Sequence, residues 1–177
     1  MKKFITLLLL CLTGMTAWAA DAFYLKNGDN YIGMDGNLSV VDASNKMLCT
    51  FNAQTDGSFQ IALPSRFIHI GSSGRWSQGD ATNATLYKVS GTTATKVTSV
   101  AVGESYVIVG VKDSKNYALT AENYGSGTDR RLVGTEVTIS GDALTVSSTK
   151  ITWTLEANSD TRENIEGVGL KTDAGDY

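Results

Sequence analysis

A spaced set of apolar residues occurs twice in this chain at a constant offset of 36 residues. The matched pairs are Phe23 and Phe59, Leu25 and Ile61, Tyr31 and Phe67, Ile32 and Ile68, and Phe51 and Tyr87. A looser third copy begins at Tyr106 and ends at Trp153. Units of this size cannot bury their apolar faces alone, so we expect the three to pack around one core. That core would hold the aromatic residues that open and close the units, namely Phe23, Phe51, Phe59, Tyr87, Tyr106 and Trp153.

Each unit is predicted to consist of short strands. Runs rich in Val, Ile, Thr, Tyr and Phe are separated by clusters of Gly, Asn, Asp and Ser, which is the pattern of strands joined by turns. The expected strands cover residues 59–63, 66–70, 86–89, 105–111, 136–139, 144–146 and 151–155. No window after Ala20 keeps an apolar period of 3.6 residues, so the fold class is predicted to be all-β.

Several segments resemble the repeats of a known family. Residues 23–28, 86–89, 106–109 and 152–156 are similar to segments of the β-trefoil-like repeats found in secreted Bacteroidetes proteins. The resemblance implies a β-trefoil-like domain of three units spanning residues 20–157. A two-sheet β-sandwich is the alternative architecture, because evenly spaced short strands suit both folds.

One departure from the sugar-binding members of that fold is visible. Ricin-type trefoils carry a Gln two residues before the core Trp, whereas Gly74 precedes Trp76 and Ile151 precedes Trp153 at that spacing. The ricin-type sugar site is therefore not expected here.

The first 19 residues have the three parts of a secretory signal peptide. Lys2 and Lys3 form a basic start, an apolar run follows, and small residues lead to the expected cut between Ala19 and Ala20. A lipoprotein signal at Cys11 is disfavoured because Leu10 stands where a small residue is expected. The apolar run is shorter than the roughly 20 residues that span a bilayer, and no later run is longer. We therefore expect an extracytoplasmic protein, periplasmic or secreted, with no membrane span.

The last residues, 158–177, repeat the opening pattern of the first unit and then stop. We expect them to be the start of a further repeat, an edge strand or a tail. Two interpretations follow: the chain is one domain, or it is a piece of a longer array.

Charge and cysteine content restrict the partners and the compartment. Removal of 19 of the 177 residues leaves 13 basic against 18 acidic side chains, a net charge of −5. An acidic excess disfavours nucleic acid, whose phosphates require basic surfaces. Cys49 is the one cysteine that remains, so no intramolecular disulfide is possible, and we expect it to be a buried, inert thiol.

The residues needed for catalysis are scarce. His69 is the only histidine, and no nucleophile motif lies near it in the sequence, so a structural role is expected for it rather than a place in a Ser-His-Asp arrangement. A zinc site needs several His or Cys ligands, and one of each remains after the signal peptide is removed. Nucleotide-binding glycine motifs are absent from the sequence, and most Asp residues stand in turn-like clusters. We therefore expect no enzyme activity, no catalytic residue, no metal site and no cofactor; a hydrolase is the least favoured class.

A glycine-rich loop at residues 71–83 is the candidate ligand site. Trp76 would be the platform for a sugar ring, with Arg75, Asp80 and Asn83 as polar partners. The alternative is that Trp76 belongs to the core, because the 36-residue offset pairs it with Val40.

A second polar loop, at residues 123–131, is predicted to contact a ligand or another subunit; the alternative is a solvated, mobile loop. Taken together, these features favour a non-catalytic binding or accessory module for glycans. The competing hypothesis is a structural or adhesive protein that binds other proteins at the cell surface.

Overall fold

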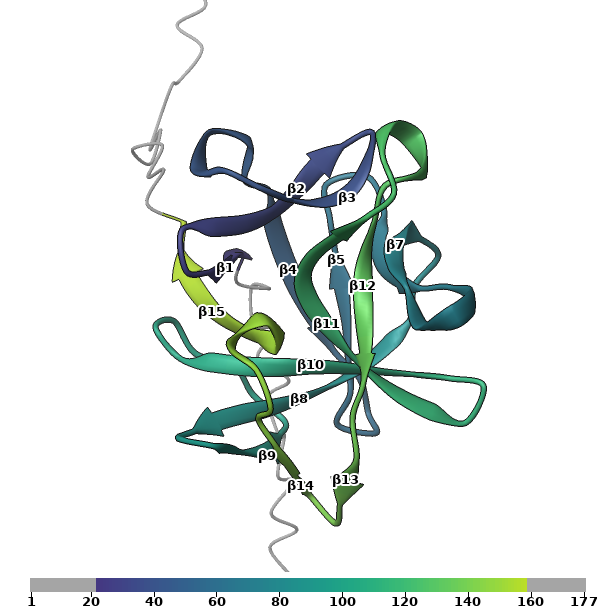
Figure 1. The fold of residues 1–177 in the computed structure, drawn as a ribbon. Helices are drawn as coiled ribbons and strands as arrows, with labels where there is room; N and C mark the ends of the chain where they lie inside the picture. Colours follow the sequence, from purple (N-terminus) through teal and green to yellow (C-terminus); the bar gives the residue numbers. More distant parts are fainter. Residues whose placement is uncertain (1–21, 159–177) are drawn as a thin grey trace, which may run out of the picture.

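The computed structural model describes residues 22–158 (Figure 1). The predicted signal peptide at residues 1–19 lies outside the described residues. The predicted tail at 158–177 also lies outside them, apart from Asn158.

Six strands form a closed ring. Each is antiparallel to its two neighbours, and the last strand pairs with the first. In ring order they are β1 (Ala22–Asn27), β4 (Leu48–Ala53), β5 (Phe59–Ala62), β8 (Asn83–Ser90), β10 (Ser105–Lys112) and β15 (Thr152–Ala157). A closed ring leaves none of its strands with an unpaired edge. The all-β class predicted from the sequence is confirmed.

The same pairing pattern occurs three times around this ring. In each of three strand pairs, an inward-facing apolar residue of one strand stands opposite one of its neighbour. These pairs are Leu25 with Leu155, Phe51 with Ile61, and Leu86 with Ile108. All six side chains are buried in the main apolar cluster. Each repeat of the sequence therefore contributes one opening and one closing strand to a shared core.

Tyr87 is an exception to the predicted core. The other five opening and closing aromatic residues lie in the main cluster, whereas Tyr87 lies in a second one with Val107 and Leu144. Leu86 occupies the inward position, opposite Ile108. Successive residues of a strand face opposite sides, so Tyr87 points outward. The prediction for Tyr87 was wrong by one residue.

Three hairpins lie at one end of the ring, in the upper half of Figure 1. They are β2 (Asn30–Asp35) with β3 (Asn37–Val41), β6 (Phe67–Ile70) with β7 (Trp76–Gly79), and β11 (Lys115–Tyr124) with β12 (Arg131–Glu136). Asparagine side chains connect them. The Asn123 amide accepts from the Val40 N–H at 2.8 Å and donates to the Val40 carbonyl at 3.2 Å. Asn37 Oδ1 accepts from the Gln78 N–H at 3.1 Å.

The remaining strands extend the sheet at the other end. β9 (Thr93–Val97) pairs with β8 and with β14 (Ala143–Thr145), which pairs with β13 (Ile139–Ser140). The strand predicted at 136–139 is divided, because β12 ends at Glu136 and β13 begins at Ile139. The other predicted strands are confirmed, with small differences at their ends.

The helical segments are single 3-10 turns. They are η1 (Ala43–Asn45), η2 (Ser72–Gly74), η3 (Gly127–Asp129) and η4 (Thr149–Ile151). Across residues 22–158, no helix has the length and apolar character needed to cross a membrane.

Candidate functional site

Trp76 lies in the core rather than on the surface. It begins β7, is 1% exposed and belongs to the main apolar cluster. It stands opposite Ile70 across the β6–β7 hairpin, as Leu38 stands opposite Met34 across β2–β3. The β6–β7 connection is longer than the β2–β3 connection, so the residue of the first repeat that is equivalent to Trp76 is Leu38 and not Val40. A buried indole offers no ring face to a sugar, so the platform predicted at Trp76 is wrong, and the alternative that it belongs to the core holds.

An exposed aromatic ring lies beside the next residue. The guanidinium carbon of Arg75 is 3.6 Å from the centroid of the Tyr124 ring, which is cation–π geometry. Tyr124 ends β11 and is 45% exposed, more than any other aromatic residue in the described part of the chain. The contact brings together the two loops that the sequence singled out, 71–83 and 123–131.

A hollow of about 410 Å³ opens next to this contact. Its lining comes from β6, the η2 turn, β7 and β12. The residues are His69, Gly71, Ser72, Arg75, Ser77 and Arg131. Two arginines, a histidine and two serines therefore line one space, and no Asp or Glu is among the residues that line it.

Close backbone packing holds the η2 turn in place. The Gly71 N–H donates to the Arg75 carbonyl at 2.7 Å. A Cβ at Gly74 would lie 2.3 Å from Cδ1 of Tyr117, and a Cβ at Gly134 would lie 1.8 Å from the Gly74 carbonyl oxygen. Glycine at these positions lets β11 and β12 approach the turn. Arg75 is thus presented by a turn packed on rigid strands, a favourable arrangement for recognition.

His69, in β6, is one of the residues that line the hollow. Its Nδ1 lies 3.1 Å from the Asp80 carbonyl oxygen and 2.9 Å from Thr82 Oγ1. A carbonyl only accepts, so a hydrogen bond to Asp80 requires the hydrogen on Nδ1. Among residues 22–158, no hydrogen bond involves the other ring nitrogen, Nε2.

Two of the predicted polar partners lie outside the hollow. The Asp80 contact to His69 is made through its backbone carbonyl. Asn83 begins β8 opposite Gln60, and its Oδ1 accepts from Gln60 Nε2 at 3.0 Å. Of the four residues predicted for this site, Arg75 alone lines the hollow, and it does so with His69 and Arg131, which the sequence did not assign to a ligand.

The pairing of β7 with β12 explains why the sequence reading missed these partners. Leu132 stands opposite Trp76, so the antiparallel register places Arg131 across from Ser77, and both residues line the hollow with Arg75. The loop at 123–131 was singled out for its polarity, but nothing in its residues indicates which part of the chain it approaches.

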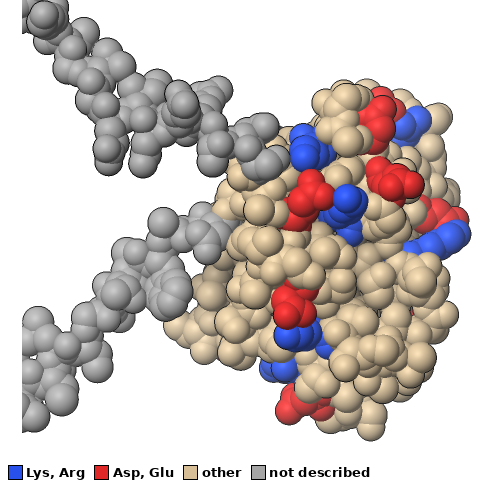
Figure 2. Space-filling view, turned by 90° about the vertical axis from the view of Figure 1, so that its left-hand side faces the viewer, with Lys and Arg blue, Asp and Glu red and all other residues tan. Residues whose placement is uncertain are grey.

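The face shown in Figure 2 carries charges of both signs. On the face shown in Figure 2, basic and acidic residues alternate, and neither sign forms a continuous patch. Mixed charge of this kind is typical of a solvated surface.

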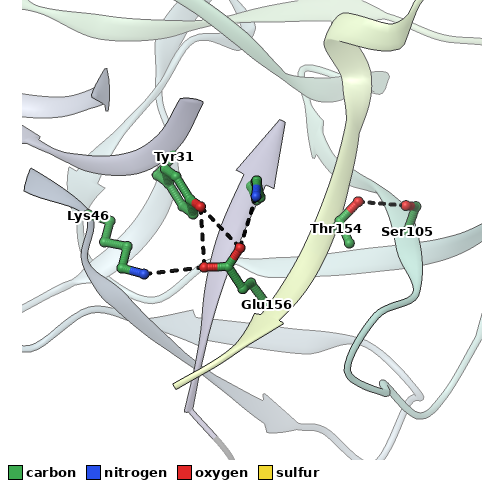
Figure 3. Close-up of polar contacts among 6 residues, drawn as sticks. Tyr31, Lys46, Ser105, Thr154 and Glu156 are labelled. Atoms are coloured by element: carbon green, nitrogen blue, oxygen red, sulfur yellow. Dashed lines mark hydrogen bonds and ion pairs between the residues drawn. The ribbon is translucent and has the colours of Figure 1, made fainter. Parts of the chain in front are cut away.

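A polar cluster around Glu156 connects β15 to the first repeat (Figure 3). The carboxylate accepts from Lys26 at 3.1 Å, from Lys46 at 3.2 Å and from the Tyr31 hydroxyl at 3.0 Å. Burial raises the pKa of Glu156, but these hydrogen bonds outweigh it, and its pKa lies below the ordinary value. Because each group here has a partner, the cluster is a structural connection between strands rather than an open site.

No three His, Cys, Asp or Glu side chains gather closely enough to hold a metal ion within the described range. No protein-family model matches the chain, and no curated protein matches its sequence.

Proposed function

We propose that this chain is a non-catalytic binding module that recognises glycans through the hollow beside Tyr124. The observation that carries the proposal is the contact between the exposed Tyr124 ring and Arg75, which also lines the hollow. An aromatic ring covers the apolar face of a sugar. Guanidinium, imidazole and hydroxyl groups form hydrogen bonds with its substituents. The site thus has the apolar surface and the few convergent polar groups that small ligands require.

We propose further that the fold is a β-trefoil-like arrangement of three units, of the kind found in secreted Bacteroidetes proteins. Support comes from the six-stranded ring, the threefold repetition of its register and the three hairpins at one end. The two-sheet sandwich is less well supported, because its sheets would be separate, whereas here the first and last strands pair.

The proposed location is outside the cytoplasm, in the periplasm or the surrounding medium. It rests on the signal-peptide pattern of residues 1–19. N-terminal sequencing of exported material should give Ala20 as the first residue. Retention of Lys2, or a lipid on Cys11, would contradict this.

A glycan array tests the binding function. We expect the mature protein to bind a defined subset of glycans, with binding lost in the presence of the free sugar. Tyr124→Ala should weaken that binding by about tenfold, because it removes the sugar-facing ring. Val102→Ala is the matched control, since Val102 is also a large exposed residue but lies away from the hollow.

Two results would overturn the proposal. Glycan binding that is unchanged in Tyr124→Ala would show that the binding site lies elsewhere. The absence of any glycan binding would contradict the proposed function. Concentration-dependent self-association in analytical ultracentrifugation, together with no glycan binding, would favour the alternative of a structural or adhesive surface protein.

A further inference from the structure

Arg75 and Arg131 differ from most of the basic residues on this protein. Seven of the Lys and Arg residues within 22–158 form ion pairs. Those without one in this range are Arg66, Arg75, Lys96 and Arg131. Two of these four line the same hollow, so positive charge without a protein counter-charge is concentrated there.

The contacts that these two arginines do make leave most of their donors free. Arg75 lies against the Tyr124 ring through its guanidinium group. Arg131 Nη1 donates to the backbone carbonyl of Asp129 at 2.8 Å. A guanidinium has five N–H donors, and the contacts described here satisfy only a few of them.

Both arginine side chains are half-buried. A charge in that position interacts more strongly with a nearby opposite charge than one in bulk water does. The guanidinium fork also matches the two oxygens of a carboxylate or a sulfate, with which it forms paired hydrogen bonds. Ser72 and Ser77 add hydroxyl donors to the same space.

From this arrangement we infer that the hollow takes an anionic substituent of the glycan, a carboxylate or a sulfate. The inference rests on the proposed function, because the sugar ring that carries the anion would lie against Tyr124. The class of ligand is then an acidic glycan, such as one that ends in a uronate or a sulfated sugar. The chain as a whole has an acidic excess, whereas the charged residues that line the hollow, Arg75 and Arg131, are basic. We therefore expect an anionic sugar to bind at the hollow rather than elsewhere on the surface.

Matched oligosaccharides test this inference. Three ligands of equal length and linkage would end in galactose, in galacturonate or in galactose 6-sulfate, with sodium sulfate as a fourth probe. Titration calorimetry should give a dissociation constant about tenfold lower for at least one anionic sugar than for the neutral one, with a difference that shrinks as salt is added. The comparison of galacturonate with the sulfated sugar identifies which anion is preferred.

Variants assign the preference to the hollow. Arg131→Gln should reduce the anionic preference from about tenfold to about twofold. Arg66→Gln removes another arginine without an ion pair, one that does not line the hollow, and should leave the preference unchanged. Thermal melting checks that both variants fold; if Arg131→Gln does not, Arg75→Gln replaces it.

The outcomes separate the inference from the function on which it rests. Equal binding of neutral and anionic sugars would overturn the inference and leave the glycan function intact. The same holds for an anionic preference that persists in Arg131→Gln, or in Arg75→Gln where that variant replaces it. Binding of sodium sulfate alone, or of none of the four probes, together with no binding on the glycan array, would overturn the glycan function itself.

Discussion

The indole of Trp76 occupies the space that a side chain at Gly110 would need: a Cβ at position 110 would lie 2.7 Å from Cη2 of that ring. The same Cβ would lie 3.3 Å from Cδ1 of Ile70. Glycine in the middle of β10 therefore allows the second repeat to insert its tryptophan into the core.

Gly110→Ala should destabilise the protein by about 1–3 kcal/mol, because the added methyl overpacks a buried site. The free energy of unfolding in urea measures this. Gly71→Ala is the control, since a Cβ there would lie 3.6 Å from the nearest atom, an ordinary contact, and should change stability by about 0.5 kcal/mol or less. Equal effects of the two substitutions would contradict the packing described.

Trp153→Ala should cost about 3–5 kcal/mol, because it empties a large site in the core. Trp153 is fully buried, and its Nε1 donates to the Leu119 carbonyl at 2.9 Å. Removing the donor also leaves that carbonyl unsatisfied. A loss of this size is a large part of the stability of an ordinary domain, so the urea midpoint should fall sharply. An unchanged midpoint would refute the assignment of Trp153 to the shared core.

Cys49 should resist alkylation by iodoacetamide in the folded protein and react once the protein is unfolded in urea. The thiol is buried, and burial raises its pKa to about 12, so little reactive thiolate forms. Labelling followed by mass spectrometry checks this. Rapid modification of the native protein would contradict the burial.

The same pKa shift predicts a loss of stability in alkali. The unfolded thiol ionises near its ordinary value of 9.0, whereas the folded thiol keeps its proton up to about 12. Between these values the unfolded state has released a proton that the folded state retains, so the free energy of unfolding falls as pH rises. In Cys49→Ala the free energy of unfolding should fall less as pH rises, because this thiol is absent. Urea melts on both sides of pH 9 measure the difference. Parallel pH profiles for the two proteins would contradict the prediction.

Glu156→Gln should destabilise the protein at neutral pH and have less effect in acid. The folded pKa of Glu156 is lowered, so its stabilising contribution is present above the unfolded value of 4.5 and is lost as pH falls through the folded pKa. Thermal melting at neutral and acidic pH measures the difference from the unaltered protein. Glu104→Gln is the control, because its single pair with Lys88 is more exposed. A destabilisation that does not vary with pH would argue for lost packing instead.

The sequence contained the fold class and most of the core. Alternating residues and glycine-containing turns predicted the strands, because one buried face imposes a two-residue period. The 36-residue offset placed Phe23 and Ile61 correctly in the ring. It failed at Tyr87 because Leu86, beside it, is also apolar, and a constant offset cannot decide which of two adjacent apolar residues faces inward.

The candidate site was predictable only in part. Composition identified both loops, and Arg75, predicted as a polar partner of a ligand, lines the hollow; its contact with a ligand stays a prediction. The prediction for Trp76 was wrong because the η2 turn lengthens the β6–β7 hairpin, so that Trp76 is equivalent to the core residue Leu38 of the first repeat. Arg131 lines the same hollow as Arg75 because β12 pairs with β7, a tertiary contact that local sequence patterns do not contain.

The pairing of β1 with β15 affects the order in which the molecule can form. Leu25 and Leu155 come from opposite ends of the described chain, and closing so long a loop costs conformational entropy before any contact compensates for it. Chains dominated by such distant pairings fold slowly. Because synthesis proceeds from the N-terminus, β1 remains without β15, one of its two neighbours in the ring, until the third repeat has left the ribosome, and the ring closes last.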